Sequence, residues 1–412
     1  MSPAESKDHP YRWTVLFGVW LIYFAFGLCI ASTAPLVTEI KDTLDIGNGL
    51  MGATLGAWQL TYIAAALPLG MLLDKIGVAL GLLLSTMVMA ASMFLRGIAP
   101  DGPTLFVAVA LFGLGGPLIS IGAPKLIALW FTGVGRGMAM GIYMTGPALG
   151  GIAALSLSNS LLLPLIGSWR GVLIFLGLCV LIGGAIWWGI SRHAEARRRD
   201  GKAVGNSKSK SLQAFREIAS LRTVQIVLLM SIGIFLLNHG LNNWLPEILR
   251  EKGMNGVDAG FWASIPTLVG IAGALTIPRF ATPERRIPIM LFLFLAVLTA
   301  TLLLHLSPGP GLVVGLMLQG IARSSMMTVA ILLLMEAPGV PAERAGMAGG
   351  MFFTIAEIGG VLGPSTIGLV SAASGGFAVP LMMCSVVSLA LIVLLGSLWQ
   401  IQKGLARSVS NR

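Results

Sequence analysis

Apolar stretches of about 20 residues recur along the whole chain, and most of them are separated by short polar segments. An α-helix of that length crosses the roughly 30 Å hydrocarbon core of a bilayer. The composition agrees, because 56% of the 412 residues are hydrophobic and 11% are charged, whereas a soluble domain is about a quarter charged. The shorter alternating segments typical of membrane β-barrels are absent from the sequence. We therefore predict an all-α membrane protein that crosses the bilayer many times.

Twelve spans are expected, with boundaries uncertain by a few residues. They cover residues 13–37, 50–73, 78–97, 104–131, 137–162, 170–191, 223–246, 257–279, 287–306, 311–335, 345–370 and 378–401. The first span is too long for the apolar core of a signal peptide, and no small-residue cleavage motif follows it. The long connection 192–222 predicts three parts: an N-terminal six-helix bundle (1–191), a basic cytoplasmic linker (192–222) and a C-terminal six-helix bundle (223–412).

Loop charge predicts the orientation of the chain. With the N-terminus inside, the cytoplasmic segments hold 20 of the 27 lysines and arginines, and the external segments hold five. The five external residues are Lys41, Arg96, Arg170, Arg250 and Lys252. By the positive-inside rule both termini are expected in the cytoplasm, and the net charge of +10 reflects contact with the inner leaflet. Phe215 is the one phenylalanine, tyrosine or tryptophan among the nine lysines and arginines of the linker, so nucleic-acid binding is not expected.

The two halves of the sequence repeat each other at a spacing of about 210 residues. The matching positions are Arg12 with Arg222, Pro68 with Pro278, RGMAMG at 136–141 with RAGMAGG at 344–350, and Gly150-Gly151 with Gly359-Gly360. Two parallel six-helix repeats of this kind are typical of one architecture of membrane transporters.

The loop after the second expected span reads GMLLDKIG at 70–77. It resembles the G-x-L-x-D-[RK]-x-G-[RK]-[RK] signature of the major facilitator superfamily, except that Val78 and Ala79 replace the final basic pair. The resemblance covers the whole chain through the span count, the central linker and the repeat. It implies the major facilitator fold, alternating access and a bacterial-type inner membrane. It also implies a gating role for Asp74 and Arg136, and the basic pair that belongs to the same charge network in the family is replaced here by Val78 and Ala79.

Two further stretches resemble parts of this family. GPALGG at 146–151 is similar to a pattern of the fifth span that is often associated with exporters. Physically, its small residues let helix backbones approach and its proline bends the helix. NNWLPEIL at 242–249 and GIYMTGPALG at 141–150 resemble the cyanate and nitroimidazole transporter branch.

Three ionisable side chains lie deep inside expected spans: Arg323, Glu357 and His239. A charge at the bilayer centre costs about 2.5–3.5 kcal/mol on insertion scales, so such residues normally face a cavity or one another. In one interpretation, Arg323 binds an anionic substrate through its planar fork and Glu357 carries a coupled proton. In a second, Glu357 binds a cationic substrate, and Arg323 tunes Glu357. In a third, the two residues form a static buried pair that fixes helix register.

His239 is the alternative proton carrier, since its unperturbed pKa lies near neutrality. Asn238, Asn242 and Asn243 surround it in the sequence. Unpaired polar groups are costly in hydrocarbon, so this cluster is expected to line the cavity or to bridge to a neighbouring helix.

Other candidates follow from helical spacing. Gln319 precedes Arg323 by one turn, and Phe353 precedes Glu357 by one turn, so each pair shares a helix face. These four residues are expected to take part in substrate or ion coupling.

An aromatic wall is expected in the first half, from Trp58, Gln59 and Tyr62 with Tyr143. Such a wall suits a small organic substrate or a cation, and the alternative is plain packing. Lys125 is expected to snorkel to the inner interface.

We expect a proton-coupled transporter of a small organic anion that acts as a monomer in the lipid bilayer. The first alternative is proton-coupled efflux or exchange of a cationic or amphipathic compound, and the second is a non-transporting receptor on the same fold. An enzyme is not expected, because the sequence has no phosphate-binding loop. No metal or cofactor is expected either, and the three cysteines lie in apolar segments.

Overall fold

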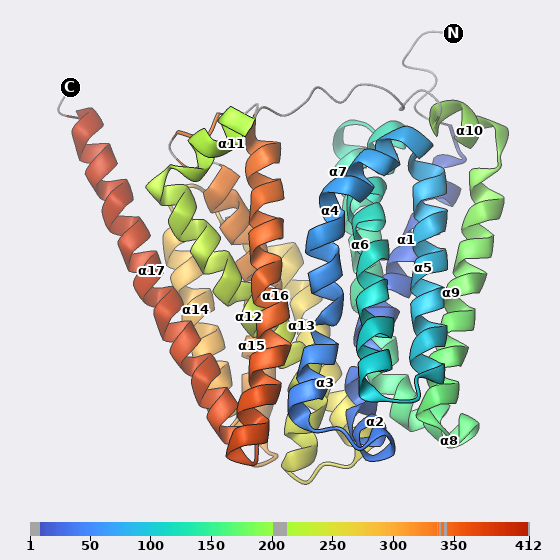
Figure 1. Cartoon of the computed structure of the whole chain (residues 1–412). Helices are drawn as coiled ribbons and strands as arrows, with labels where there is room; N and C mark the ends of the chain where they lie inside the picture. Colours follow the sequence, from blue (N-terminus) through green and yellow to red (C-terminus); the bar gives the residue numbers. More distant parts are fainter. Residues whose placement is uncertain (1–8, 201–211, 336, 338, 342–343, 411–412) are drawn as a thin grey trace. The chain divides into compact units, whose positions relative to one another are not determined.

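The computed structural model describes residues 9–200, 212–335, 337, 339–341 and 344–410 (Figure 1). Every regular element in these ranges is helical. The elements are α1 (Arg12–Ala31), η1 (Ala34–Leu36), α2 (Val37–Leu44), α3 (Asn48–Leu55), α4 (Ala57–Ile76), α5 (Val78–Ile98), α6 (Gly102–Trp130), α7 (Gly133–Leu157), η2 (Ser158–Leu162), α8 (Leu163–Ile166), α9 (Trp169–Ser191), α10 (Ala194–Asp200), α11 (Leu212–Ala219), α12 (Arg222–Glu251), α13 (Gly256–Phe280), α14 (Arg286–Leu303), α15 (Pro310–Met335), α16 (Ala345–Ser374) and α17 (Ala378–Ser410).

Twelve helical segments in the described part of the chain are long and apolar enough to cross a membrane. They coincide with the twelve expected spans, so the predicted all-α membrane fold is confirmed. The largest difference is in the first span, which continues to Leu44 beyond its expected end at residue 37. This span is not one continuous helix, because α1 ends at Ala31 and the short turn η1 connects it to α2. Pro35 explains the break, since proline cannot donate the helical hydrogen bond.

The helices form two compact units. Unit 1 holds α1 to α10 and unit 2 holds α11 to α17, except that residues 48–52 group with unit 2 and residues 256–261 group with unit 1.

Glycines bring two helix pairs into backbone contact, one pair in each unit. In unit 1, α7 packs on α1, and a Cβ at Gly150 would overlap the carbonyl oxygen of Phe24. In unit 2, α16 packs on α12, and a Cβ at Gly359 would overlap the carbonyl oxygen of Ile232. Each pair therefore depends on a position without a side chain, as small residues permit between membrane helices.

Arg96 corrects the charge count made from the sequence. It was placed among the external charges, but it lies in the last turn of α5 and is 2% exposed. Its Nη1 donates to the Cys29 carbonyl oxygen at 3.1 Å and to Thr33 Oγ1 at 3.3 Å, and its guanidinium lies over the Phe112 ring. Hydropathy locates a charge near the end of a span but does not show that neighbouring helices cover it. Arg96 therefore ties the end of α5 to the break that follows α1.

Candidate functional site in each helical unit

Arg323 is the centre of the polar cluster in unit 2. Its Nη1 donates to Asn242 Oδ1 at 2.6 Å and to Thr267 Oγ1 at 3.3 Å. The cluster thus joins α15, α12 and α13. No carboxylate in the described part of the chain forms an ion pair with Arg323, and neither Nε nor Nη2 donates a hydrogen bond within that part. Because an arginine has five N–H donors in a fixed fork, most of its binding capacity is left for a ligand.

Glu357 lies in α16 and is 7% exposed. Among the residues that the structure describes, its Oε2 atom has no hydrogen-bond partner and its carboxyl group forms no ion pair. α12 packs against both α15, which carries Arg323, and α16. The helices that carry the two charged residues therefore both pack on α12, but the residues do not form an ion pair with each other in this structure.

His239 and the asparagines lie along α12. Asn243 donates to the His239 carbonyl oxygen at 2.8 Å, and the His239 ring lies 5.5 Å from the Phe235 ring. Asn238 is half-buried, and Asn242 is the asparagine of this helix that accepts a hydrogen bond from the arginine among the described residues.

The two neighbours predicted from helical spacing differ in their surroundings. Gln319 is 2% exposed, and its Oε1 atom has no hydrogen-bond partner in the described ranges. Phe353 is 39% exposed and packs edge-on against Phe352 and Phe235, with ring centroids 5.7 Å and 6.5 Å away. An apolar surface thus lies one turn before Glu357 on α16.

The predicted aromatic residues of unit 1 belong to a larger cluster. Trp58 and Tyr62 pack edge-on at 6.1 Å, and Tyr62 shares a hydrogen bond with Ser120 at 2.9 Å. Gln59 is fully buried. Tyr143 packs on Tyr23 with ring centroids 4.9 Å apart.

Two phenylalanines join these rings, and sequence reasoning missed both of them. Phe26 lies 6.4 Å from both Tyr23 and Trp58, and Phe112 lies 5.6 Å from Trp58. Phe26 and Phe112 also stack on each other. In an apolar span a phenylalanine carries no signal of its own, so only packing shows that it belongs to this aromatic cluster.

The two predicted gating residues are both accessible. Asp74, at the end of α4, forms an ion pair with Lys125 of α6, and both side chains are partly exposed. Lys125 was expected to extend to the membrane interface, and in the structure its ammonium group pairs with this carboxylate at the end of α4. Arg136 is exposed on α7.

Comparison with known proteins identifies the class to which this fold and these sites belong. The Major Facilitator Superfamily model matches residues 19–364, so the chain belongs to that superfamily, as the resemblance predicted. It is a secondary transporter of small organic solutes and not an enzyme.

Several relatives match nearly the whole chain, and two of them represent different substrates. A probable galactarate/D-glucarate transporter of Bacillus subtilis (strain 168) is 23% identical over 92% of this chain and 89% of its own length. The 2-nitroimidazole transporter of Escherichia coli (strain K12) is 25% identical over 95% of this chain and 97% of its own length. These identities do not separate the sugar-acid branch from the nitroimidazole branch.

Solved structures show the same fold. A bacterial homolog of the human lysosomal transporter Spinster superposes with a TM-score of 0.72 at 17% identity, covering 95% of this chain and 97% of that one. The nucleoside transporter NupG superposes with a TM-score of 0.75 at 15% identity, covering 96% of this chain and all of that one.

Proposed function

We propose that this protein is an inner-membrane symporter that moves a small organic anion together with a proton. It works by alternating access as a monomer, with both termini in the cytoplasm. The observation that carries the proposal is the hydrogen bonding of Arg323. Only its Nη1 atom donates to side chains in the described part of the chain, and both of those side chains are neutral. Arg323 is half-buried, and a charge shielded from water without a counter-charge is costly. A carboxylate that binds the free edge of the guanidinium supplies the missing charge in a bidentate geometry.

Glu357 has the properties expected of the proton carrier. It is buried without a cationic partner among the described residues. An isolated carboxylate is costly to bury, and the group escapes this cost by binding a proton. Binding of the anion at Arg323 and of the proton at Glu357 would thus neutralise both of these residues, the state in which they most easily cross an apolar barrier.

The relatives support the same substrate class. The Bacillus subtilis relative is a probable galactarate/D-glucarate transporter, and its two named substrates are dicarboxylates. We therefore expect a small carboxylate as the substrate.

A second candidate function is efflux or exchange of an organic cation or an aromatic compound. The aromatic cluster of unit 1 favours it, since such rings attract cations and flat molecules. The relative named as a 2-nitroimidazole transporter favours it as well.

A thermal-shift screen of the purified protein tests the proposal against this alternative. Small carboxylates, including galactarate and galactonate, would be compared with organic amines and 2-nitroimidazole. A ligand at a hundred times its Kd stabilises the folded state by about 2.7 kcal/mol. We expect stabilisation by a carboxylate and a Kd about tenfold to a hundredfold higher in Arg323→Ala, since a hydrogen bond to a charged group contributes about 1.5–3 kcal/mol.

Two companion variants make this result specific. Arg323→Lys keeps the charge but loses the fork, so it should bind with intermediate affinity. Arg216→Ala removes an exposed arginine from α11 of the same unit and should bind as the unchanged protein does. Stabilisation by amines or by 2-nitroimidazole, lost in Glu357→Gln, would favour the second candidate function instead.

A further inference from the structure

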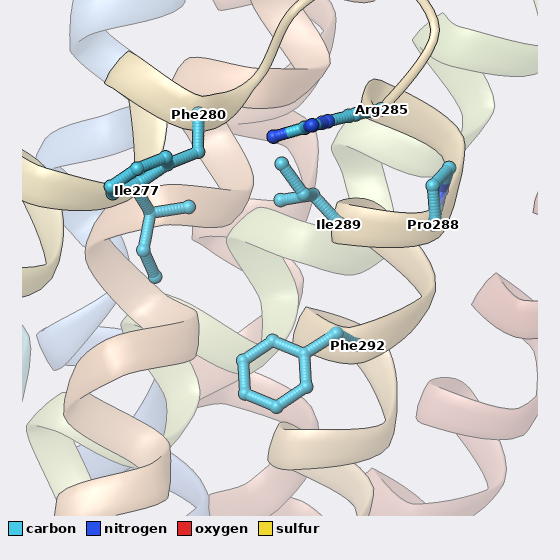
Figure 2. Close-up of a pocket in the computed structure, with 6 residues that line it drawn as sticks. All are labelled: Ile277, Phe280, Arg285, Pro288, Ile289 and Phe292. Carbon is cyan, nitrogen blue, oxygen red and sulfur yellow. The ribbon is translucent and has the colours of Figure 1, made fainter.

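A groove of about 390 Å³ lies where α13 ends and α14 begins, within unit 2 (Figure 2). Five of its six lining residues are apolar and the sixth is Arg285. The apolar residues are Ile277, Phe280, Pro288, Ile289 and Phe292. Figure 2 shows the Arg285 side chain extending toward Phe280 above Ile289, with Phe292 farther along the groove. A single cation therefore lies at one end of an otherwise apolar groove.

The groove is open to its surroundings. Phe280 is 61% exposed and Phe292 is 53% exposed. Seven residues separate Arg285 from Phe292, which corresponds to about 10 Å along an α-helix. The groove thus offers a cation and, about two helical turns deeper, an exposed aromatic ring.

The charge around the mouth of the groove is positive. Arg279, in the last turn of α13, and Arg285 are exposed, and Arg286 is buried with its Nε donating to the Ala281 carbonyl oxygen at 3.2 Å. Glu284 is the acidic residue of this loop. Three arginines against one glutamate favour an anion at this end of the groove.

We propose that this groove binds one anionic phospholipid, with the phosphate on Arg285 and an acyl chain along Ile289 and Phe292. The separation of charge and apolar lining matches a lipid better than a free phosphate, which would leave the exposed rings uncovered. With both termini in the cytoplasm, as proposed above, the mouth faces the anionic inner leaflet, where basic pockets between helices bind lipid headgroups.

Native mass spectrometry of the detergent-purified full chain tests the proposal. Phosphatidylglycerol and phosphatidylcholine with identical acyl chains would be titrated separately. We expect phosphatidylglycerol to bind more tightly, and Arg285→Gln to weaken its binding about fivefold, the contribution of one basic residue near an anionic lipid. Phe292→Ala should weaken the binding of both lipids, because it removes a contact with the acyl chain and not with the phosphate.

The control variant is Arg216→Gln, which removes an exposed arginine of α11 that does not line the groove. It should bind phosphatidylglycerol as the unchanged protein does. Equal binding of the two lipids, or equal losses in the Arg285 and Arg216 variants, would overturn the proposal. Displacement of phosphatidylglycerol by inorganic phosphate would show a phosphate site instead. Arg323→Ala should bind phosphatidylglycerol as the unchanged protein does. The lipid experiment can therefore be interpreted even if the transport proposal fails.

Discussion

Glutamine in place of Glu357 is expected to preserve anion binding and to abolish accumulation driven by a pH gradient. Glutamine has the shape of the protonated acid, but it cannot release a proton. Since Oε2 of Glu357 has no hydrogen-bond partner in the described part of the structure, the change breaks no contact that holds the site together. The measurement is uptake of a radiolabelled substrate carboxylate into proteoliposomes, with and without an imposed pH gradient.

The size of the effect follows from the coupling. One proton moved with one monovalent anion allows about tenfold accumulation for each pH unit, because one unit corresponds to about 1.36 kcal/mol. The unchanged protein should approach this ratio, and Glu357→Gln should stay near one. Exchange of internal for external substrate requires no net proton movement, so exchange should persist in the variant.

Glu247→Gln is the matched control for this change. Glu247 is 8% exposed, close to the 7% of Glu357, but it lies 3.7 Å from Arg250 in an ion pair. It should keep pH-driven accumulation. If Glu357→Gln accumulates substrate normally, the proton is carried elsewhere, and His239→Gln becomes the variant to measure. If Glu357→Gln instead loses ligand binding, Glu357 contacts the substrate directly.

Thermal stability separates these roles from a static ion pair. Removing one partner of a buried pair typically costs about 3–5 kcal/mol. Glu357 has no such partner among the described residues, so Glu357→Gln should melt at or above the temperature of the unchanged protein.

The sequence predicted the spans well because hydropathy alone decides which segments can cross a bilayer. The expected span at 170–191 is observed as Trp169–Ser191, and that at 311–335 as Pro310–Met335. Hydropathy carries no information on how the side chains of neighbouring helices pack. It therefore could not show that Arg96 is covered by α1 and α6, or that Lys125 reaches Asp74 from another helix.

The candidate site was predicted in part for a related reason. A charged or polar residue inside an apolar span stands out, so Arg323, Glu357 and Asn242 were found from the sequence. Thr267 was not, because a threonine in a helix usually satisfies its hydroxyl locally and carries no charge. Only the structure shows that its hydroxyl accepts a hydrogen bond from Arg323.

Alanine in place of Gly359 is expected to destabilise unit 2 and to abolish substrate-dependent stabilisation. The new methyl group would overlap the carbonyl oxygen of Ile232 on α12, and a backbone atom cannot move aside as a flexible side chain can. The two helices must then separate, and overpacking of this kind typically costs about 1–3 kcal/mol. Since α12 carries Asn242 and α16 carries Glu357, separation also displaces the candidate site. Thermal melting with and without the substrate carboxylate measures both effects.

The chain provides its own control for this prediction. Gly349 lies in the same helix, and a Cβ there would meet nothing within 4 Å, so Gly349→Ala should be neutral or stabilising by up to about 1 kcal/mol. The repeat provides a second pair in unit 1, where Gly150→Ala overlaps Phe24 and Gly141→Ala meets nothing within 4 Å. Loss of stability in Gly359→Ala and Gly150→Ala but not in their partners would show that the glycines matter for helix approach. Equal losses in all four variants would mean that these glycines are needed for backbone freedom, and the close-packing argument would fail.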